Sequence, residues 1–150
     1  MLGPMALTSK RAVAVVCSQC GSPLTVALLA AAPDRLSRYA SDRQPVVEPG
    51  VAIVDPEPRA VWKSSPDKIR ETVELCPPGS LVVNPDDLLP GAVVVTGSAA
   101  GCCGLDGTDG PNQACASCGQ VLGTAQTDGW TPAEVRFLPA AIVYANEPPA

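Results

Sequence analysis

Two short cysteine motifs decide the fold that this sequence predicts: CSQCG at residues 17–21 and CASCG at residues 115–119. Two cysteines three positions apart, followed by glycine, form a tight turn whose backbone amides point at the sulfurs, and the glycine relieves the strained exit from that turn. Each turn offers two thiolates, and two turns complete a tetrahedral four-thiolate shell with Zn–S distances of about 2.3 Å. The sequence therefore predicts a Zn²⁺ site, and its expected ligands are Cys17, Cys20, Cys115 and Cys118.

Both motifs continue to a leucine at the same spacing, Leu24 in the first and Leu122 in the second. The two octapeptides resemble the knuckles of zinc ribbons and of rubredoxin-like proteins. This resemblance covers only the motifs, implies a four-cysteine metal site, and is nearly silent on function. In zinc ribbons the knuckles commonly lie some tens of residues apart, whereas here 94 residues (21–114) separate Cys20 from Cys115. The strands that flank the two knuckles must therefore pair across a long insertion.

A second pair of cysteines, Cys102 and Cys103, lies in a glycine-rich loop at residues 97–111 and leaves the ligand set open. Together with Cys115 and Cys118 they would close a local four-thiolate site, and a mixed site with Cys17 and Cys20, which leaves one of the vicinal pair as a spare, is a further alternative. The same pair supports an alternative function, a thiol-based redox or nucleophilic enzyme, whose thiolate would need activation by loop amides or by a cation. The remaining cysteine, Cys76, is expected to pack in the core.

The chain contains no histidine, and this excludes several chemistries. Ser-His-Asp and Cys-His nucleophiles both need an imidazole base, and catalytic zinc sites are usually built on imidazole ligands. The loop at residues 97–111 lacks the Lys-Ser/Thr of a Walker loop and the spacing of a dinucleotide fingerprint. We therefore expect a structural metal and name no catalytic or cofactor-binding residue.

The charge balance argues against nucleic acid as a partner, because the formal charge is −5 and no basic cluster is longer than two residues. No stretch approaches the ~20 apolar residues that span a bilayer, so we expect no membrane association. The partner stays unknown, with a protein as one open answer. No convincing signal segment precedes Cys17, and seven cysteines is an odd number for a secreted disulfide framework. We therefore expect a cytoplasmic protein, and a disulfide-bonded secreted protein is the weaker alternative.

The composition favours short strands, because the chain holds 17 prolines and 13 glycines but only 3% aromatic residues. The predicted fold is mainly β with one or two short helices, arranged as small antiparallel sheets or a partly open barrel that the zinc-ribbon-like four-cysteine site clamps. We expect a single domain at residues 12–145, a disordered tail at residues 1–11, and a loose tail at residues 146–150.

The expected strands follow from β-branched and apolar runs at residues 12–17, 81–83, 92–96, 114–124 and 135–144. Ser65-Pro66-Asp67 has the chemistry of a helix start, and Ile69 and Val73 would give that helix one buried stripe. Asn84-Pro85 predicts a single helical turn. The two cysteine motifs are the only internal sequence repeat expected. The sequence thus predicts a zinc-binding protein of unknown biological role.

Overall fold

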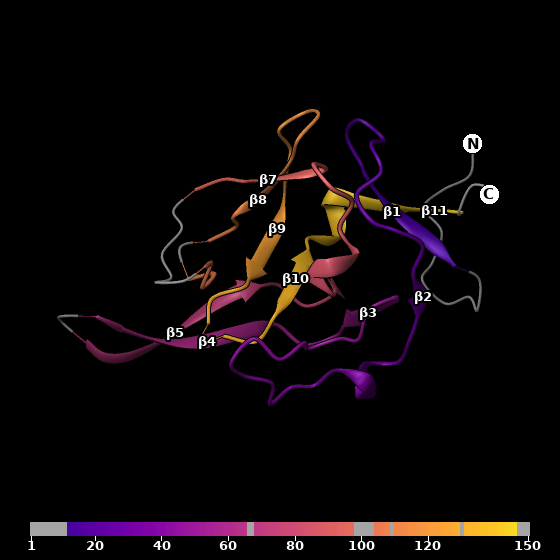
Figure 1. The fold of residues 1–150 in the computed structure, drawn as a ribbon. Helices are drawn as coiled ribbons and strands as arrows, with labels where there is room; N and C mark the ends of the chain where they lie inside the picture. Colours follow the sequence, from indigo (N-terminus) through magenta and orange to yellow (C-terminus); the bar gives the residue numbers. More distant parts are fainter. Residues whose placement is uncertain (1–11, 66–67, 98–103, 109, 130, 147–150) are drawn as a thin grey trace.

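The computed structural model describes residues 12–65, 68–97, 104–108, 110–129 and 131–146, with the backbone alone for residues 62–71 and 146. Within these residues the protein is mainly β (Figure 1), and its only helices are three 3₁₀ turns of three residues each. None of these turns is long or apolar enough to cross a membrane. The strands are β1 (Val13–Cys17), β2 (Leu29–Ala30), β3 (Val51–Asp55), β4 (Arg59–Ser65), β5 (Lys68–Cys76), β6 (Ser80–Val83), β7 (Val93–Val95), β8 (Gln113–Cys115), β9 (Val121–Gln126), β10 (Glu134–Phe137) and β11 (Ile142–Asn146), and the turns are η1 (Pro33–Arg35), η2 (Pro85–Asp87) and η3 (Pro139–Ala141).

The strands form one seven-stranded sheet and two pairs. The large sheet has the order β2-β3-β6-β10-β9-β8-β7, and all of its neighbours are antiparallel except β2 and β3. The first and last described strands, β1 and β11, pair with each other, and β4 and β5 form a hairpin that extends from the opposite side of the molecule (Figure 1). The prediction of a mainly β fold of open sheets is thereby confirmed, although the largest sheet has seven strands and includes one parallel pair.

Most of the expected elements lie where the sequence placed them. The two strands before the knuckles, the strand at residues 81–83 and the strand–turn–strand around Cys115–Cys118 are all present. The Asn84 side chain caps η2 by accepting a hydrogen bond of 2.9 Å from the Asp86 amide, as its Asn-Pro signal predicted.

The helix predicted from Ser65 is wrong. Lys68–Cys76 is instead the nine-residue strand β5, which pairs with β4 over six positions. The helical reading used Ile69 and Val73, four residues apart, but Val73 and Leu75 also fit the period of two that marks a strand. Antiparallel pairing with β4 decides between the two readings. The expected tail at residues 1–11 lies outside the described residues. The expected tail at residues 146–150 does so too, except for Asn146, which is the last residue of β11.

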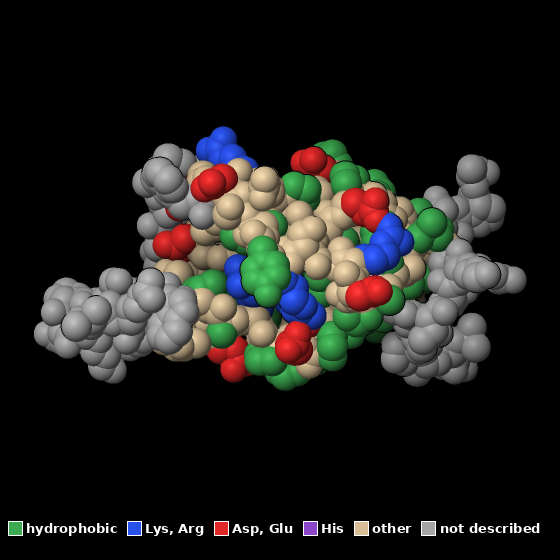
Figure 2. All heavy atoms as spheres, turned by 90° about the horizontal axis from the view of Figure 1, so that it is seen from below, with side chains coloured by type: hydrophobic (Ala, Val, Ile, Leu, Met, Phe, Trp, Pro, Cys, Tyr) green, Lys and Arg blue, Asp and Glu red, His purple; other side chains and the backbone are tan. Residues whose placement is uncertain are grey.

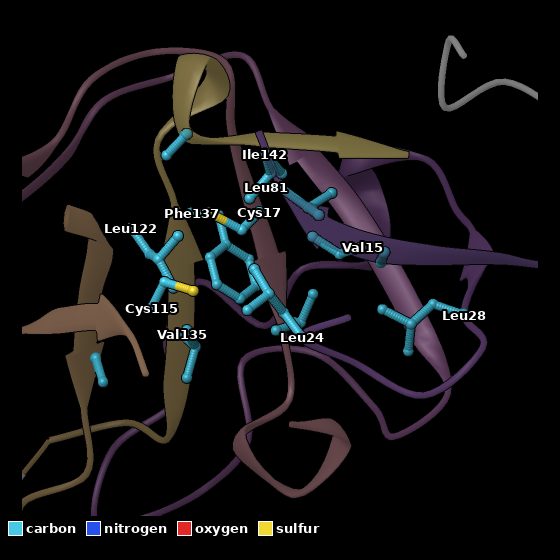
Figure 3. Packing of buried hydrophobic residues seen from close by; sticks show 14 residues of the cluster. Val15, Cys17, Leu24, Leu28, Leu81, Cys115, Leu122, Val135, Phe137 and Ile142 are labelled. Carbon is cyan, nitrogen blue, oxygen red and sulfur yellow. The ribbon is translucent and has the colours of Figure 1, made fainter. Parts of the chain in front are cut away.

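The core is centred on β10, which is buried on both faces. Successive side chains of a strand point to opposite faces, so Val135 and Phe137 enter the main hydrophobic cluster while Glu134 and Arg136 face the other way. In Figure 3 the Phe137 ring lies between Leu24 and Leu122, the leucines that follow the two knuckles, and all three side chains are fully buried. The metal motifs therefore deliver their leucines to the centre of the core.

Close packing of β9 against β10 requires glycine at position 123. A Cβ at Gly123 would overlap the backbone carbonyl of Arg136, with which the strand is paired. We expect Gly123→Ala to lower the free energy of unfolding by about 3 kcal/mol, since backbone must move to relieve the overlap. Urea denaturation measures this loss. Gly129→Ala, whose new Cβ would meet only the flexible end of Arg43 at 3.6 Å, is the control, and equal losses in both variants would contradict the packing argument.

Candidate metal centre

The four cysteines of the two motifs meet in space, although the chain between them is long. The Sγ atoms of Cys17, Cys20, Cys115 and Cys118 all lie within 4.8 Å of one another. Two contacts cross from one knuckle to the other, at 3.6 Å from Cys17 to Cys118 and 3.7 Å from Cys20 to Cys115. A tetrahedron with about 2.3 Å from centre to corner has edges of about 3.8 Å, whereas a disulfide is near 2.05 Å. The spacing fits four thiolates around one ion.

The two knuckles share one backbone geometry. In the first, the Gly21 amide donates to the Cys17 carbonyl at 2.8 Å, and in the second, the Gly119 amide donates to the Cys115 carbonyl at 2.8 Å. Both glycines have positive φ, +76° for Gly21 and +81° for Gly119, a conformation that other residues adopt only with strain. The match that was visible in the sequence is therefore a match of turn geometry.

The cluster presents one sulfur of each knuckle to the core and the others outward. Cys17 and Cys115 are buried within the main hydrophobic cluster, Cys118 is half-buried, and Cys20 is exposed. Cys17 lies at the end of β1 and Cys115 at the end of β8, so a bound ion would link the β1–β11 pair to the large sheet. Such a link joins parts of the chain that have no strand pairing with each other among the described residues.

The electrostatics of the thiols favour a cation at their centre. Hydrogen bonds with the side chain and backbone of Ser22 lower the pKa of Cys20 to about 6. A backbone hydrogen bond from Gln120 lowers the pKa of Cys118, but burial and the neighbouring thiols raise it overall to about 12. Neighbouring thiolates disfavour one another because they carry the same charge. A divalent cation removes that repulsion, and its binding releases the remaining protons.

A second repeated element supports the knuckles, so the expectation that the cysteine motifs are the only internal repeat is wrong. The element is LPGAVVV at residues 89–95 and LPAAIVY at residues 138–144. The two segments are identical at the leucine, at the proline, at Ala92 and Ala141, and at Val94 and Val143. Each segment makes a turn in which an alanine amide donates to the leucine carbonyl, Ala92 to Leu89 at 3.1 Å and Ala141 to Leu138 at 3.0 Å. Each then continues into a strand, β7 or β11.

The two repeated elements are arranged with approximate two-fold symmetry around the cysteine cluster. One half consists of the first knuckle and residues 89–95, and the other consists of the second knuckle and residues 138–144. Within each half, the backbone amide of the leucine that begins the repeat donates to the carbonyl of the leucine that follows the knuckle, from Leu89 to Leu24 at 2.9 Å and from Leu138 to Leu122 at 2.8 Å. Between the halves the strands are exchanged, because β11 pairs with β1 and β7 pairs with β8. The alanine carbonyls are exchanged as well: Ser18 donates to Ala141 at 2.9 Å, and Ala116 donates to Ala92 at 3.0 Å.

Gln120 joins the halves beside the four cysteines. Its Nε2 donates to the Ser18 hydroxyl at 3.1 Å and to the Ala141 carbonyl at 2.8 Å, and its backbone contacts the Cys118 sulfur. The sequence alone does not point to Gln120, because its partner Ser18 lies 102 residues away and its partner Ala141 lies in a different element. The only sequence feature that could have indicated a role for Gln120 is its position, a polar side chain two residues after Cys118.

We expect Gln120→Ala to weaken metal binding by about tenfold, because contacts that orient ligands typically contribute that much affinity. Competition against a chromophoric chelator measures the affinity of the purified protein. Ser117→Ala, at an exposed position of the same knuckle, is the control and should bind metal as the parent does. An unchanged affinity in Gln120→Ala would show that the bridge does not support the site.

The other cysteines do not join this cluster within the part of the chain that the structure describes. Cys76 is buried, and its pKa is raised by burial, which suits the packing role expected for it. Cys102 and Cys103, the alternative ligands and candidate reactive thiols, lie outside the described residues. Comparison with known proteins finds no relative: no family model, no curated protein and no solved structure matches the chain.

Proposed function

We propose that this protein binds one Zn²⁺ ion through Cys17, Cys20, Cys115 and Cys118, and that the ion is structural. The observation that carries this proposal is the convergence of four Sγ atoms within 4.8 Å, with cross-knuckle spacings close to a tetrahedral edge. A shell of four thiolates leaves no coordination position for water or substrate. Zinc sites of this kind stabilise a fold and do not activate a reactant.

The donor set also admits iron, because tetrahedral sulfur sites bind either metal. We assign zinc because a closed shell of four thiolates from Cys-x-x-Cys turns is the common form of a structural zinc site, and metal analysis distinguishes it from iron. Thiolate ligands require a compartment that keeps cysteines reduced, so the proposal includes the cytoplasm as the location. The proposal extends to one compact domain over residues 12–145, and the biological process and partner stay open.

Metal analysis of the purified full chain tests the proposal. Native mass spectrometry should give one zinc per chain, and reconstitution with Co²⁺ should give the intense sulfur-to-cobalt absorption of a tetrahedral four-thiolate site. Cys118→Ser should lose that spectrum, while Cys76→Ser should keep it, because Cys76 lies outside the cluster. A chain that carries iron, or that carries no metal and binds none, would refute the zinc assignment.

A further inference from the structure

The large sheet ends on one side at β7, and the outer edge of this strand is open. β7 is the last strand in the order of the sheet, and β8 is its only neighbour among the described residues. The ladder to β8 uses alternate residues: the Ala92 carbonyl accepts at 3.0 Å and the Thr96 amide donates at 2.9 Å, both to residues that flank β8. Hydrogen-bonding groups of successive strand residues point to opposite sides. The N–H and C=O groups of Val93 and Val95 therefore point outward, away from β8.

The outward groups of Val93 and Val95 have no partner within the part of the chain that the structure describes. An open edge is a template for pairing with a further strand, and proteins usually protect such an edge with charged side chains, proline or a bulge. β7 has none of these, because it consists of three valines that pair with β8 in unbroken register. The fold therefore leaves this edge ready to accept another strand.

The side chains along the edge are apolar and exposed. Val94, Val95 and Val121 are 47%, 58% and 46% exposed, and they make up half of the exposed large hydrophobic side chains among the described residues. Val94 and Val121 both lie opposite Ala114, so they share one face of the sheet. Val93, on the other face, packs partly buried against the main hydrophobic cluster. A strand added at β7 would cover valine side chains on both faces.

The chain around β7 carries no charge, because no charged residue lies between Asp87 and Asp106. β7 lies in the upper part of the molecule in Figure 1. Figure 2 shows the molecule from below, where acidic and basic side chains are interspersed over the surface. A strand with charged side chains would lose hydration at β7 without gaining a counter-charge. The edge therefore fits an uncharged, β-branched strand, and β7 of a second copy of this chain is such a strand.

We propose that β7 pairs with β7 of a second copy, antiparallel and around a two-fold axis that passes beside Val94. In this register Val93 of each copy lies opposite Val95 of the other, and each such pair exchanges both of its N–H···O bonds, so all of the outward groups find partners. Val94 then lies opposite its own counterpart in a non-hydrogen-bonded pair, where side chains approach most closely. A two-fold contact uses the same surface on both copies and closes at the dimer. The pairing joins the two seven-stranded sheets into one.

Sedimentation equilibrium of the purified full chain under reducing conditions tests the proposal. A short edge gives a small interface, and small interfaces are weak, so the measurement covers about 10 µM to 1 mM. The data should fit an equilibrium between monomer and dimer. NMR hydrogen exchange over the same concentrations locates the contact: the amides of Val93 and Val95 should exchange more slowly as the dimer forms, whereas the Val94 amide, which faces β8, should change little.

Val95→Pro is the sharpest variant, because proline removes the outward N–H and leaves the ladder to β8 intact. By symmetry the dimer loses this bond at both ends of the contact, so its dissociation constant should rise at least tenfold. Val94→Lys should also raise it at least tenfold, because it places like charges directly opposite each other. Val121→Lys makes the same change of charge on the same face, two strands from the edge, and is the matched control that keeps the dimer.

The other outcomes overturn the proposal. A chain that stays monomeric at about 1 mM does not pair through β7. A dimer that persists in Val94→Lys, or that forms without slowing exchange at Val93 and Val95, has its interface elsewhere. Species larger than a dimer would mean that β7 pairs with a different edge, so that copies add head to tail. If Val95→Pro does not fold, the parent and Val94→Lys still decide the question.

Discussion

Removing the metal is expected to lower the free energy of unfolding by about 5 kcal/mol or more. Structural zinc contributes roughly 10–16 kcal/mol in finger peptides that have no other core. The loss should be smaller here because Phe137, Leu24 and Leu122 form a core of their own. For a domain of this length, 5 kcal/mol corresponds to a decrease in Tm of about 10–20 °C. Since small domains have a total stability of about 5–15 kcal/mol, a substantial part of the chain should unfold at 37 °C.

Thermal melts of the chain, before and after chelation under reducing conditions, measure this effect. Cys118→Ser should reproduce it without a chelator, and zinc should no longer restore the stability of that variant. Cys76→Ser is the matched control, because it removes a buried cysteine outside the cluster and should still respond to zinc. An unchanged melting curve after complete metal removal would mean that the strands around the knuckles hold together unaided.

The site could be predicted from the sequence because its chemistry is local, whereas its supports are not. Each knuckle carries its cysteines, its positive-φ glycine and its core leucine within eight residues, so the pattern names the ligands without knowledge of the fold. The partners of Gln120 and the exchange of β7 and β11 depend on pairing between distant segments. The repeat that reveals this exchange, at residues 89–95 and 138–144, is short, and three of its seven positions differ.

The predicted helix was wrong for the opposite reason, since there a tertiary contact overruled a local pattern, and the buried charges have no local pattern that would predict them. Ser65-Pro66-Asp67 favours a helix start, but the following residues gain more from pairing with β4. Alternation in β10 places Glu134 and Arg136 on a face that would normally be solvated. The face of β10 that carries Glu134 and Arg136 is covered by β4 and by the segment around Val46. This covering is a tertiary effect that no local sequence pattern predicts.

Asp55→Ala is expected to destabilise the protein by about 3–5 kcal/mol, the cost of leaving a buried charge without its partner. Asp55 is the acid that two arginines share, and one of them, Arg136, is almost fully buried. Glu57→Ala removes another acid that contacts Arg38, at a position where the side chain is 66% exposed, so its cost should stay within about 1 kcal/mol. Urea denaturation at neutral pH compares the two, and similar losses would mean that burial of the ion pairs has no energetic weight.

The pH dependence of stability gives an independent test of the same contact. Burial alone would raise the pKa of Asp55, but hydrogen bonds from Arg38 and Arg136 outweigh it and lower the pKa from 3.8 to about 2. A lowered pKa in the folded state means that the stabilisation is complete above the unfolded pKa of 3.8 and is lost as the pH falls toward 2.

At pH 3 about 1 kcal/mol of this stabilisation should be lost. The difference in stability between the parent and Asp55→Asn, measured from pH 6 to pH 3, should therefore shrink by about that amount. Because both chains carry the same cysteine cluster, acid release of the metal affects them alike and cancels in the difference. A difference that stays constant over this range would mean that the charge of Asp55 does not contribute to the stability of the contact between β3 and β10.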